Sequence, residues 1–263
     1  HVILGTPQGY RGNNVVKNFW QIVEHYKINL FSGVPTLYAS LLQQDASAYD
    51  ISSLEYAICG AAPMPVELFR RFEQTTGVRI LEGYGLTEGT CVSSINPPDG
   101  ESRIGSIGLA LPWQAMKAVI LDDEGLYQRD ATVDEVGVIA IDGPNVFKGY
   151  VNPIHNKGLW IDINGHSWLN TGDLGRQDAQ GYFWLTGRKK ELIIRGGHNI
   201  DPKSIEEPLH QHPAVAMAAA VGMPDPYAGE LPVAYVELKA NAQTNEAKLL
   251  TFLQEHIQER AAQ

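Results

Sequence analysis

Helical and strand-like hydrophobic patterns alternate along the first hundred residues of the chain. Apolar side chains recur at three- and four-residue spacings in three segments, which predicts helices over residues 14–27, from Pro35 onward, and over "PVELFRRFEQTTG". Short apolar runs lie next to these segments, and we expect strands at "INLFSGVP", "LEYAICG" and "VRILEG". This alternation predicts an α/β region over residues 1–100, with a parallel sheet covered by helices on both faces.

The hydrophobic pattern changes after residue 100. Short β-rich segments such as "MKAVILDDEG", "EVGVIAIDGP" and "GYFWLTGR" are separated by glycine, aspartate and proline, and helix signals are scarce up to residue 186. We therefore expect a β-rich region over residues 101–187, in the form of a small sheet or barrel. A helix at "DPKSIEEPLHQH", two strands and a last helix then predict a small α+β subdomain over residues 191–263, with a boundary at residues 188–190.

The composition is ordinary for a globular protein, and the formal net charge is −10. A nucleic-acid partner would require a basic face, and the longest basic cluster is the Arg188–Lys190 run, so we expect no nucleic acid. No apolar run reaches the ~20 residues of a membrane helix, which leaves only peripheral membrane association open. The two cysteines, Cys59 and Cys91, suggest neither a disulfide framework nor a zinc site, and we expect buried thiols in a cytoplasmic protein.

Residues 82–90 read "EGYGLTEGT" and follow a predicted strand. They therefore lie at its carboxyl end, which is the edge where open α/β sheets bind ligands. Glycines at such an edge let the backbone approach a ligand closely, and Tyr84 between them can lie against a planar base. Thr87 offers a hydroxyl group to a phosphate, and Glu88 offers a carboxylate to Mg²⁺. The same residues also suit a plain glycine-rich turn whose polar side chains face water.

Two further stretches carry the same kind of signal. "CGAAPMP" (59–65) follows a strand and precedes a helix, and its small residues would expose backbone to a flat ligand, unless the segment is a simple connecting turn. Asp173, in the turn "TGD", could accept hydrogen bonds from two ribose hydroxyls, and Arg188 could donate to the same sugar. The alternative for Asp173 is a turn residue that bonds its own backbone.

The stretches "GAAPMP", "YGLTE", "TGDLG", "GYFWLTGRKKELIIRGGHNIDPKSIEE" and "HPAVAMAAAVGMPDPYAGELPVAYVEL" occur in this order along the chain. Together they resemble the successive motifs of the adenylate-forming (AMP-binding) superfamily, which includes acyl-CoA synthetases, nonribosomal peptide adenylation domains and luciferases. The resemblance implies that residues 1–187 are part of the large AMP-binding N-terminal domain. It also implies that residues 191–263 are part of a mobile C-terminal subdomain.

Such enzymes join a carboxylate to ATP, which gives an acyl-adenylate and pyrophosphate, and a thiol, usually coenzyme A, then displaces AMP. By this resemblance Tyr84 would stack on adenine, Thr87 would hold the α-phosphate and Glu88 would bind Mg²⁺. Asp173 and Arg188 would bind the ribose. The adenine site would also include Gly60, Ala61, Ala62 and Pro63.

The resemblance also implies roles for residues outside the nucleotide site. Lys190 matches the hinge about which the C-terminal subdomain turns between the two half-reactions. Gly196 and Gly197 would leave a narrow slot for the pantetheine arm of coenzyme A, and they also suit a β-turn. The segment "FSGVPTLYASLL" resembles the lining of the acyl pocket. The expected pocket residues are Val34, Pro35, Gly60 and Gly85.

No charged residue in this acyl segment could pair with an amino acid's ammonium group, so we favour a fatty or other apolar carboxylate, with an aryl carboxylate next.

The phosphate loop and the catalytic lysine of the superfamily have no counterpart in the sequence. We therefore expect a piece of an acid–thiol ligase that is nearly inactive alone, because no cation would balance the charge of departing pyrophosphate. An adenylation module that loads a carrier protein and a non-enzymatic nucleotide- or partner-binding role remain alternatives. The sequence pattern gives no indication of the oligomeric state.

Overall fold

The computed structural model describes residues 6, 8–188, 191–257 and 262. It divides into two compact units: residues 1–114 together with 143–147, and residues 115–142 together with 148–263. The segment 143–147 thus belongs to the N-terminal unit although it comes from the β-rich part of the sequence. Lys190, the predicted hinge residue, lies outside the described residues, and the boundary at residues 188–190 stays a prediction.

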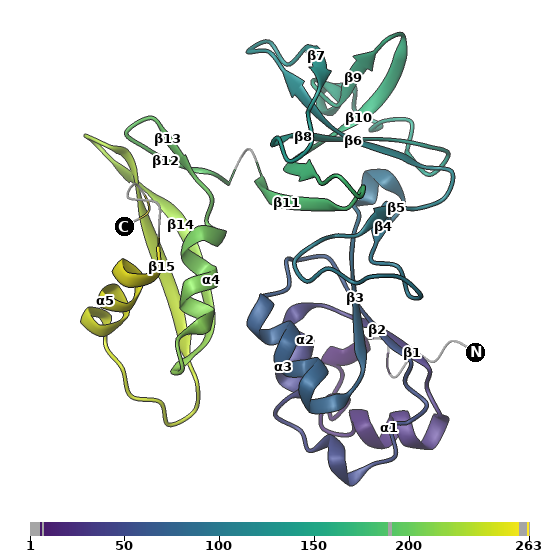
Figure 1. The fold of residues 1–263 in the computed structure, drawn as a ribbon, viewed down its shortest axis with the longest axis vertical. Coiled ribbons are helices and arrows are strands. Elements are labelled where there is room, and N and C mark those ends of the chain that lie inside the picture. Colours follow the sequence, from purple (N-terminus) through teal and green to yellow (C-terminus); the bar gives the residue numbers. More distant parts are fainter. Residues whose placement is uncertain (1–5, 7, 189–190, 258–261, 263) are drawn as a thin grey trace. The chain divides into compact units, whose positions relative to one another are not determined.

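The N-terminal unit is built on a five-stranded sheet with the order β1-β2-β3-β4-β5 (Figure 1). Its strands are β1 (Leu30–Gly33), β2 (Tyr56–Cys59), β3 (Arg79–Tyr84), β4 (Ser94–Ile95) and β5 (Leu109–Ala110). The first three strands are parallel, as predicted, but β4 and β5 run antiparallel to their neighbours. The parallel arrangement predicted for the three strands is therefore confirmed, and β4 and β5 extend the sheet in the antiparallel sense, because the short loop after β3 cannot form the long crossover that a parallel partner needs.

Three α-helices accompany this sheet: α1 (Phe19–Tyr26), α2 (Pro35–Leu41) and α3 (Val66–Thr76). Helix α2 begins at Pro35 as predicted, and α3 ends at Gly77, whose φ of 71° gives the left-handed helix cap expected for glycine. Helix α1 begins later than predicted, because Asn14 has a φ of 63° and residues 13–18 form turns. Short 3-10 helices are η1 (Gly9–Arg11), η2 (Ala46–Ala48) and η3 (Thr87–Gly89).

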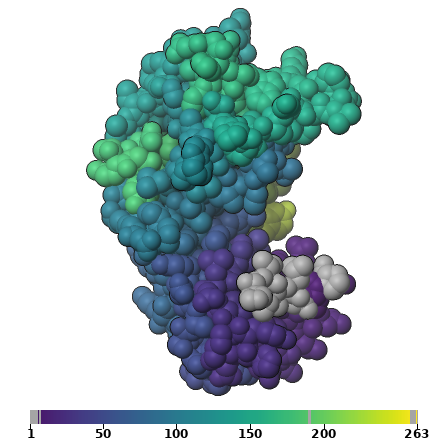
Figure 2. Space-filling model, turned by 90° about the vertical axis from the view of Figure 1, so that its right-hand side faces the viewer, coloured from purple at the N-terminus to yellow at the C-terminus, as the bar shows by residue number. Residues whose placement is uncertain are grey.

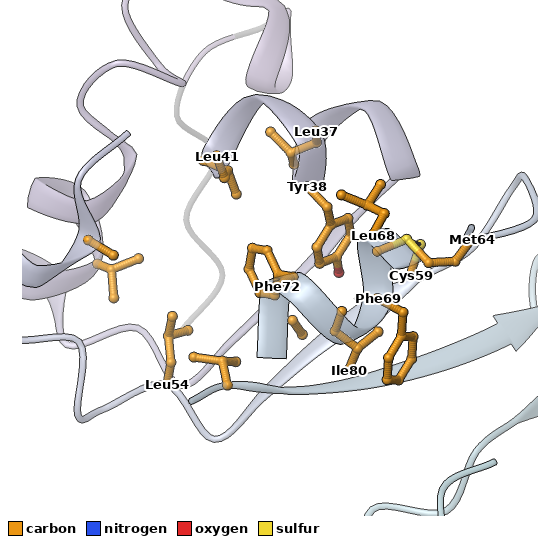
Figure 3. Close-up of a cluster of buried hydrophobic side chains, with 14 of the residues drawn as sticks. Leu37, Tyr38, Leu41, Leu54, Cys59, Met64, Leu68, Phe69, Phe72 and Ile80 are labelled. Atoms are coloured by element: carbon orange, nitrogen blue, oxygen red, sulfur yellow. Dashed lines mark hydrogen bonds between the residues drawn. The ribbon is translucent and has the colours of Figure 1, made fainter. Parts of the chain in front are cut away.

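The core of the N-terminal unit is rich in aromatic and aliphatic side chains from the helices and from β2 and β3. Figure 3 shows Tyr38 of α2 beside Phe72 of α3, with ring centroids 4.9 Å apart and an edge-to-face angle of 76°. Burial raises the pKa of Tyr38, so its hydroxyl group stays protonated and donates to the carbonyl oxygen of Ile58 at 2.7 Å. In the space-filling view, the purple and blue segments that carry α1–α3 form one continuous packed body (Figure 2).

The β-rich pattern after residue 100 corresponds to a six-stranded sheet in the second unit, which begins at Ala115, whereas β5 belongs to the sheet of the N-terminal unit. The order is β11-β10-β8-β6-β7, with β9 paired to β10. The strands are β6 (Ala115–Leu121), β7 (Tyr127–Asp130), β8 (Gly137–Asp142), β9 (Trp160–Ile163), β10 (His166–Gln177) and β11 (Phe183–Arg188), and the short helix η4 covers Pro153–Asn156. Strand β8 pairs antiparallel with both β6 and β10.

The rest of the second unit is a four-stranded sheet with the order β13-β12-β15-β14. Its elements are β12 (Ile193–Arg195), β13 (His198–Ile200), α4 (Lys203–Gln211), β14 (Val215–Asp225), β15 (Gly229–Leu238) and α5 (Glu246–His256). Ile205 and Leu209 of α4 share a core with Ile193 and Ile200 of the sheet. This confirms the predicted α+β order. Within the described part of the chain, no helix has both the length and the apolar character needed to cross a membrane.

His210 gives this part of the fold a pH-dependent stability. Burial in α4 lowers the pKa of His210 from its ordinary 6.5. When the pH falls below about 6.5, the unfolded chain binds a proton that the folded chain binds less readily, so the free energy of unfolding decreases. We expect His210→Gln to reduce the loss of stability between neutral and mildly acidic pH, as measured by urea unfolding. Replacing the exposed His166 by glutamine is the control, and an equal effect of the two substitutions would contradict the prediction.

Candidate active site

The carboxyl ends of three parallel strands meet at one edge of the N-terminal sheet. Gly33 pairs with Cys59, and Cys59 pairs with Glu82, so β1, β2 and β3 end at nearly the same level. The three segments that follow these strands therefore leave the sheet at the same edge. Together they hold the predicted residues Val34 and Pro35, Gly60 to Pro63, and Gly85 to Glu88. This is the edge where open α/β sheets bind ligands.

The segment after β2 presents its backbone at this edge. The amide nitrogen of Gly60 donates to the carbonyl oxygen of Gly33 at 3.3 Å, which continues the ladder by one residue. Ala61 has a φ of 65° and is exposed, as are Ala62 and Pro63. Small side chains on an exposed turn leave the peptide groups open to a flat ligand, which agrees with the sequence interpretation of "GAAPMP".

A buried carboxylate joins this segment to β3. Glu82 is 4% exposed, and its Oε1 atom accepts a hydrogen bond from the amide nitrogen of Met64 at 3.2 Å. Burial raises the pKa of the neighbouring Cys59 thiol to about 12, and the charge of Glu82 adds to this effect. Cys59 is therefore a neutral packing residue, as predicted for a buried thiol. The same prediction is wrong for Cys91, which is exposed in the loop after β3.

The glycines of "EGYGLTEGT" are required by the chain's own packing. A Cβ atom on Gly85 would lie 1.4 Å from the carbonyl oxygen of Cys91, and one on Gly83 would lie 2.9 Å from that of Ser94. From the sequence, these glycines are expected to allow the close approach of a ligand, but a side chain on either one would point at backbone atoms of the chain itself. Tyr84 ends β3 and is 8% exposed. The role of Gly85 in the acyl pocket stays a prediction.

Thr87 and Glu88 lie in the short helix η3, directly after the sheet edge. Thr87 is exposed and Glu88 is half-buried. Residues from the segment 143–147 hold this loop: the amide nitrogen of Phe147 donates to the carbonyl oxygen of Glu88 at 2.8 Å, and Asn145 Nδ2 donates to that of Gly89 at 2.6 Å. Sequence reasoning missed Asn145, because it lies more than fifty residues further along the chain and no periodic pattern links the two segments.

Asp173 and Arg188 are brought together by the register of β10 and β11. They are direct partners across the two strands, and Arg188 Nε donates to Asp173 Oδ1 at 2.8 Å. The Asp173 side chain is 4% exposed, whereas that of Arg188 is 61% exposed. The sequence predicts that both face one ribose, and their proximity in this unit is compatible with that prediction.

The turn that holds Asp173 is built by its neighbours. Strand β10 is irregular between Asn170 and Leu174, where Gly172 has a φ of 73°. Thr171 Oγ1 donates to the carbonyl oxygen of Ile139 at 2.7 Å and accepts from the amide nitrogen of Asp173 at 3.1 Å. The hydroxyl of "TGD" thus fixes the turn, and the Asp173 carboxylate is left to face its partner Arg188.

Gly196 and Gly197 form the two-residue turn between β12 and β13. Arg195 pairs with His198, and the glycines have φ values of 57° and 84°. Two successive left-handed residues are typical of the hairpin turn for which glycine is preferred. The predicted β-turn is therefore present, and open space surrounds the position of a Cβ atom on either glycine. The pantetheine slot stays a prediction.

The donor groups suit a nucleotide with its metal ion. Among the described residues there is no group of three or more His, Cys, Asp and Glu side chains that could hold a metal by itself. Mg²⁺ commonly takes one or two protein carboxylates and completes its shell with phosphates and water, so Glu88 alone is an adequate protein ligand. The carboxylate of Asp173 has the acceptor atoms that two ribose hydroxyls require, but its side chain is 4% exposed and already accepts from Arg188, so the ribose role stays a prediction.

Comparison with known proteins assigns the chain to a family. Residues 2–151 match the profile of the AMP-binding enzymes, and residues 204–263 match that of the AMP-binding enzyme C-terminal domain. The chain belongs to the AMP-binding enzyme family, as its sequence motifs and α/β fold predict.

Two of the curated relatives that the chain matches bear the names of CoA ligases. It is 49% identical over 261 residues to the marinolic acid–CoA ligase of Pseudoalteromonas sp. (strain SANK 73390), covering 99% of this chain and 39% of that protein. It is 38% identical over 239 residues to a long-chain-fatty-acid–CoA ligase of Bacillus subtilis (strain 168), covering 90% of this chain and 41% of that protein. The chain thus spans about two fifths of the length of these relatives.

Solved structures agree with this assignment. ATP-bound MatB from Rhodopseudomonas palustris superposes with a TM-score of 0.81 at 32% identity, over 91% of this chain and 46% of that one. The anthranilate CoA ligase AuaEII in complex with anthranoyl-AMP gives a TM-score of 0.78 at 28% identity, over 93% of this chain and 46% of that one.

Proposed function

We propose that the whole protein of which this chain forms part is an AMP-forming acyl-CoA ligase. It would activate a fatty or other apolar carboxylate with ATP and transfer the acyl group to coenzyme A. The observation that carries the proposal is the single sheet edge where the exposed turn after β2 and the Thr87–Glu88 helix emerge together. Mg²⁺, coenzyme A and a cytoplasmic location are parts of the same proposal.

In the proposed reaction the carboxylate oxygen attacks the α-phosphorus of ATP, the bond to the β-phosphate oxygen breaks, and pyrophosphate leaves. The sulfur of coenzyme A then attacks the acyl carbon, and AMP leaves. Thr87 would donate its hydroxyl to an α-phosphate oxygen, and Asp173 with Arg188 would orient the ribose. Mg²⁺ on Glu88 would supply positive charge to the phosphates.

The preference for an apolar acid rests on the acyl segment. Val34 is the cap of α2 and packs against the apolar core, and Pro35 is buried in the first turn of that helix. A second charged group on the acid, such as an ammonium or another carboxylate, would need a partner of opposite charge in this segment. The relative that bears a fatty-acid name supports the same preference. An aryl carboxylate is the second candidate, favoured by the likeness to the anthranilate CoA ligase.

A panel of carboxylates tests the proposal on the whole protein. With ATP, Mg²⁺ and coenzyme A, we expect pyrophosphate release and a thioester product with medium- or long-chain fatty acids. Benzoate and anthranilate test the aryl alternative, and a carrier protein with a phosphopantetheine arm replaces coenzyme A in a parallel series. Pyrophosphate release with none of these acids would overturn the ligase proposal. If the acyl group is transferred to the carrier protein but not to coenzyme A, the carrier protein is the acceptor and the coenzyme A part of the proposal is wrong.

A further inference from the structure

The loop between β3 and β4, which carries Thr87 and Glu88, contains two residues with an unfavourable backbone conformation. Thr90 and Cys91 are neither glycine nor asparagine, yet they have φ values of 51° and 82°. Such left-handed residues persist only where surrounding contacts determine them. The loop makes its own short helical bonds, and the amide nitrogen of Ser93 donates to the carbonyl oxygen of Tyr84, the last residue of β3, at 2.8 Å.

Two amide side chains from distant segments add to the hydrogen bond by which Phe147 holds Glu88. Asn145 Nδ2 donates to the carbonyl oxygen of Gly89 at 2.6 Å and to Gln114 Oε1 at 3.0 Å. Gln114 Nε2 donates to the carbonyl oxygen of Val92 at 3.1 Å. The Asn145–Gln114 pair thus bridges Gly89 and Val92 within the loop. Thr90 Oγ1 completes the arrangement by donating to the carbonyl oxygen of Asn145.

The direction of these hydrogen bonds is determined by the backbone. The loop offers two carbonyl oxygens, those of Gly89 and Val92, so Asn145 and Gln114 must each direct the nitrogen of the side-chain amide toward the loop. The Oε1 atom of Gln114 accepts from Asn145, whose Nδ2 group has two hydrogens and donates to both Gly89 and Gln114. A carboxylate at position 114 would accept from Asn145 but would repel the carbonyl oxygen of Val92. Glutamine and glutamate at position 114 have the same shape and therefore differ in the contact with Val92 alone.

We propose that Asn145 and Gln114 are positioning residues for the adenylation half-reaction. They hold Thr87 and Glu88 at the sheet edge without themselves contacting the nucleotide. The inference rests on the proposed ligase function for its kinetic consequence. Because the pair acts on the loop that carries the metal ligand, its loss should alter the use of MgATP much more than the binding of the carboxylate or of coenzyme A.

Asn145→Ala and Gln114→Glu test the proposal in the whole protein. We expect Asn145→Ala to raise the KM for MgATP or the Mg²⁺ concentration for half-maximal rate about 10-fold, with a fall in kcat of similar size. Gln114→Glu keeps the shape and the bond from Asn145, so its effect should be smaller and in the same direction. The KM values for the carboxylate and for coenzyme A should change less than about twofold. Asn241→Ala, at an exposed turn of the second unit, is the matched control.

Amide hydrogen exchange provides a readout that does not depend on activity. Both variants should exchange faster over residues 86–92, while the core strand β3 keeps its protection. Unchanged exchange in this loop would overturn the positioning role, and so would a lowered thermal stability with unaltered MgATP dependence. If the wild-type protein releases no pyrophosphate, the ligase proposal fails, and loop exchange still decides whether the pair holds the loop.

Discussion

Replacing Glu88 by glutamine in the whole protein is expected to lower the rate of pyrophosphate release by about 100- to 1000-fold. The substitution keeps the size of the side chain in helix η3 but removes the negative charge proposed to bind Mg²⁺. Losing one positioned electrostatic contact to a transition state typically has an effect of this order. Because the amide oxygen is a weaker metal ligand, the remaining activity should also require a higher Mg²⁺ concentration. Initial rates over a Mg²⁺ titration measure both effects.

Glu124→Gln is the matched control for this prediction. It removes the same charge from an exposed turn between β6 and β7, and we expect rates within about twofold of wild type. Circular dichroism spectra of both variants should match that of the wild type, because neither side chain is fully buried. A Glu88→Gln enzyme with a wild-type rate and an unchanged Mg²⁺ requirement would contradict the assignment of Glu88 as the metal ligand.

The order of the elements is predictable from the sequence because local patterns determine it. Proline at the start of α2 and glycine at the end of α3 predict where these helices begin and end, and the β-rich pattern after residue 100 predicts a sheet region without an α-helix. The direction of β4 was not predictable in the same way. A two-residue strand has no period of its own, and it is defined by its pairing with Gly83 and Tyr84 on one side and with β5 on the other.

In the candidate site, too, local features are predictable from the sequence and contacts between distant segments are not. Residues next to strand ends are predictable, since a strand followed by glycine marks a sheet edge, and the parallel register then brings Gly60 and Gly85 to the same edge. The pairing of Asp173 with Arg188 follows from one hairpin. Asn145 and Gln114 were missed, because their role depends on the three-dimensional approach of segments that are far apart in sequence. The reason for Gly85 was also missed, since only coordinates reveal the carbonyl group that occupies the space of a side chain.

Gly85→Ala is expected to have the largest effect on stability, a decrease of about 3 kcal/mol or more in the free energy of unfolding. The new Cβ atom would lie 1.4 Å from the carbonyl oxygen of Cys91 and 2.8 Å from the Cα atom of Val92, and backbone cannot rotate away as a side chain can. The loop would have to leave its position beside β3, and Thr87 and Glu88 would move with it. Activity of the whole protein should therefore fall together with stability.

A graded series of glycine substitutions separates this close approach from a general effect of alanine. A Cβ atom on Gly83 would meet the carbonyl oxygen of Ser94 at 2.9 Å, and one on Gly60 would meet that of Gly83 at an ordinary 3.4 Å. Urea unfolding followed by tryptophan fluorescence should thus rank the losses of stability as Gly85→Ala, then Gly83→Ala, then Gly60→Ala. Gly60→Ala should be within about 1 kcal/mol of wild type, because its contact is ordinary and its φ is not left-handed. Equal stability of the Gly85 and Gly60 variants would mean that the loop after β3 is free to shift, and close packing against Cys91 would then not be the reason for a glycine at position 85.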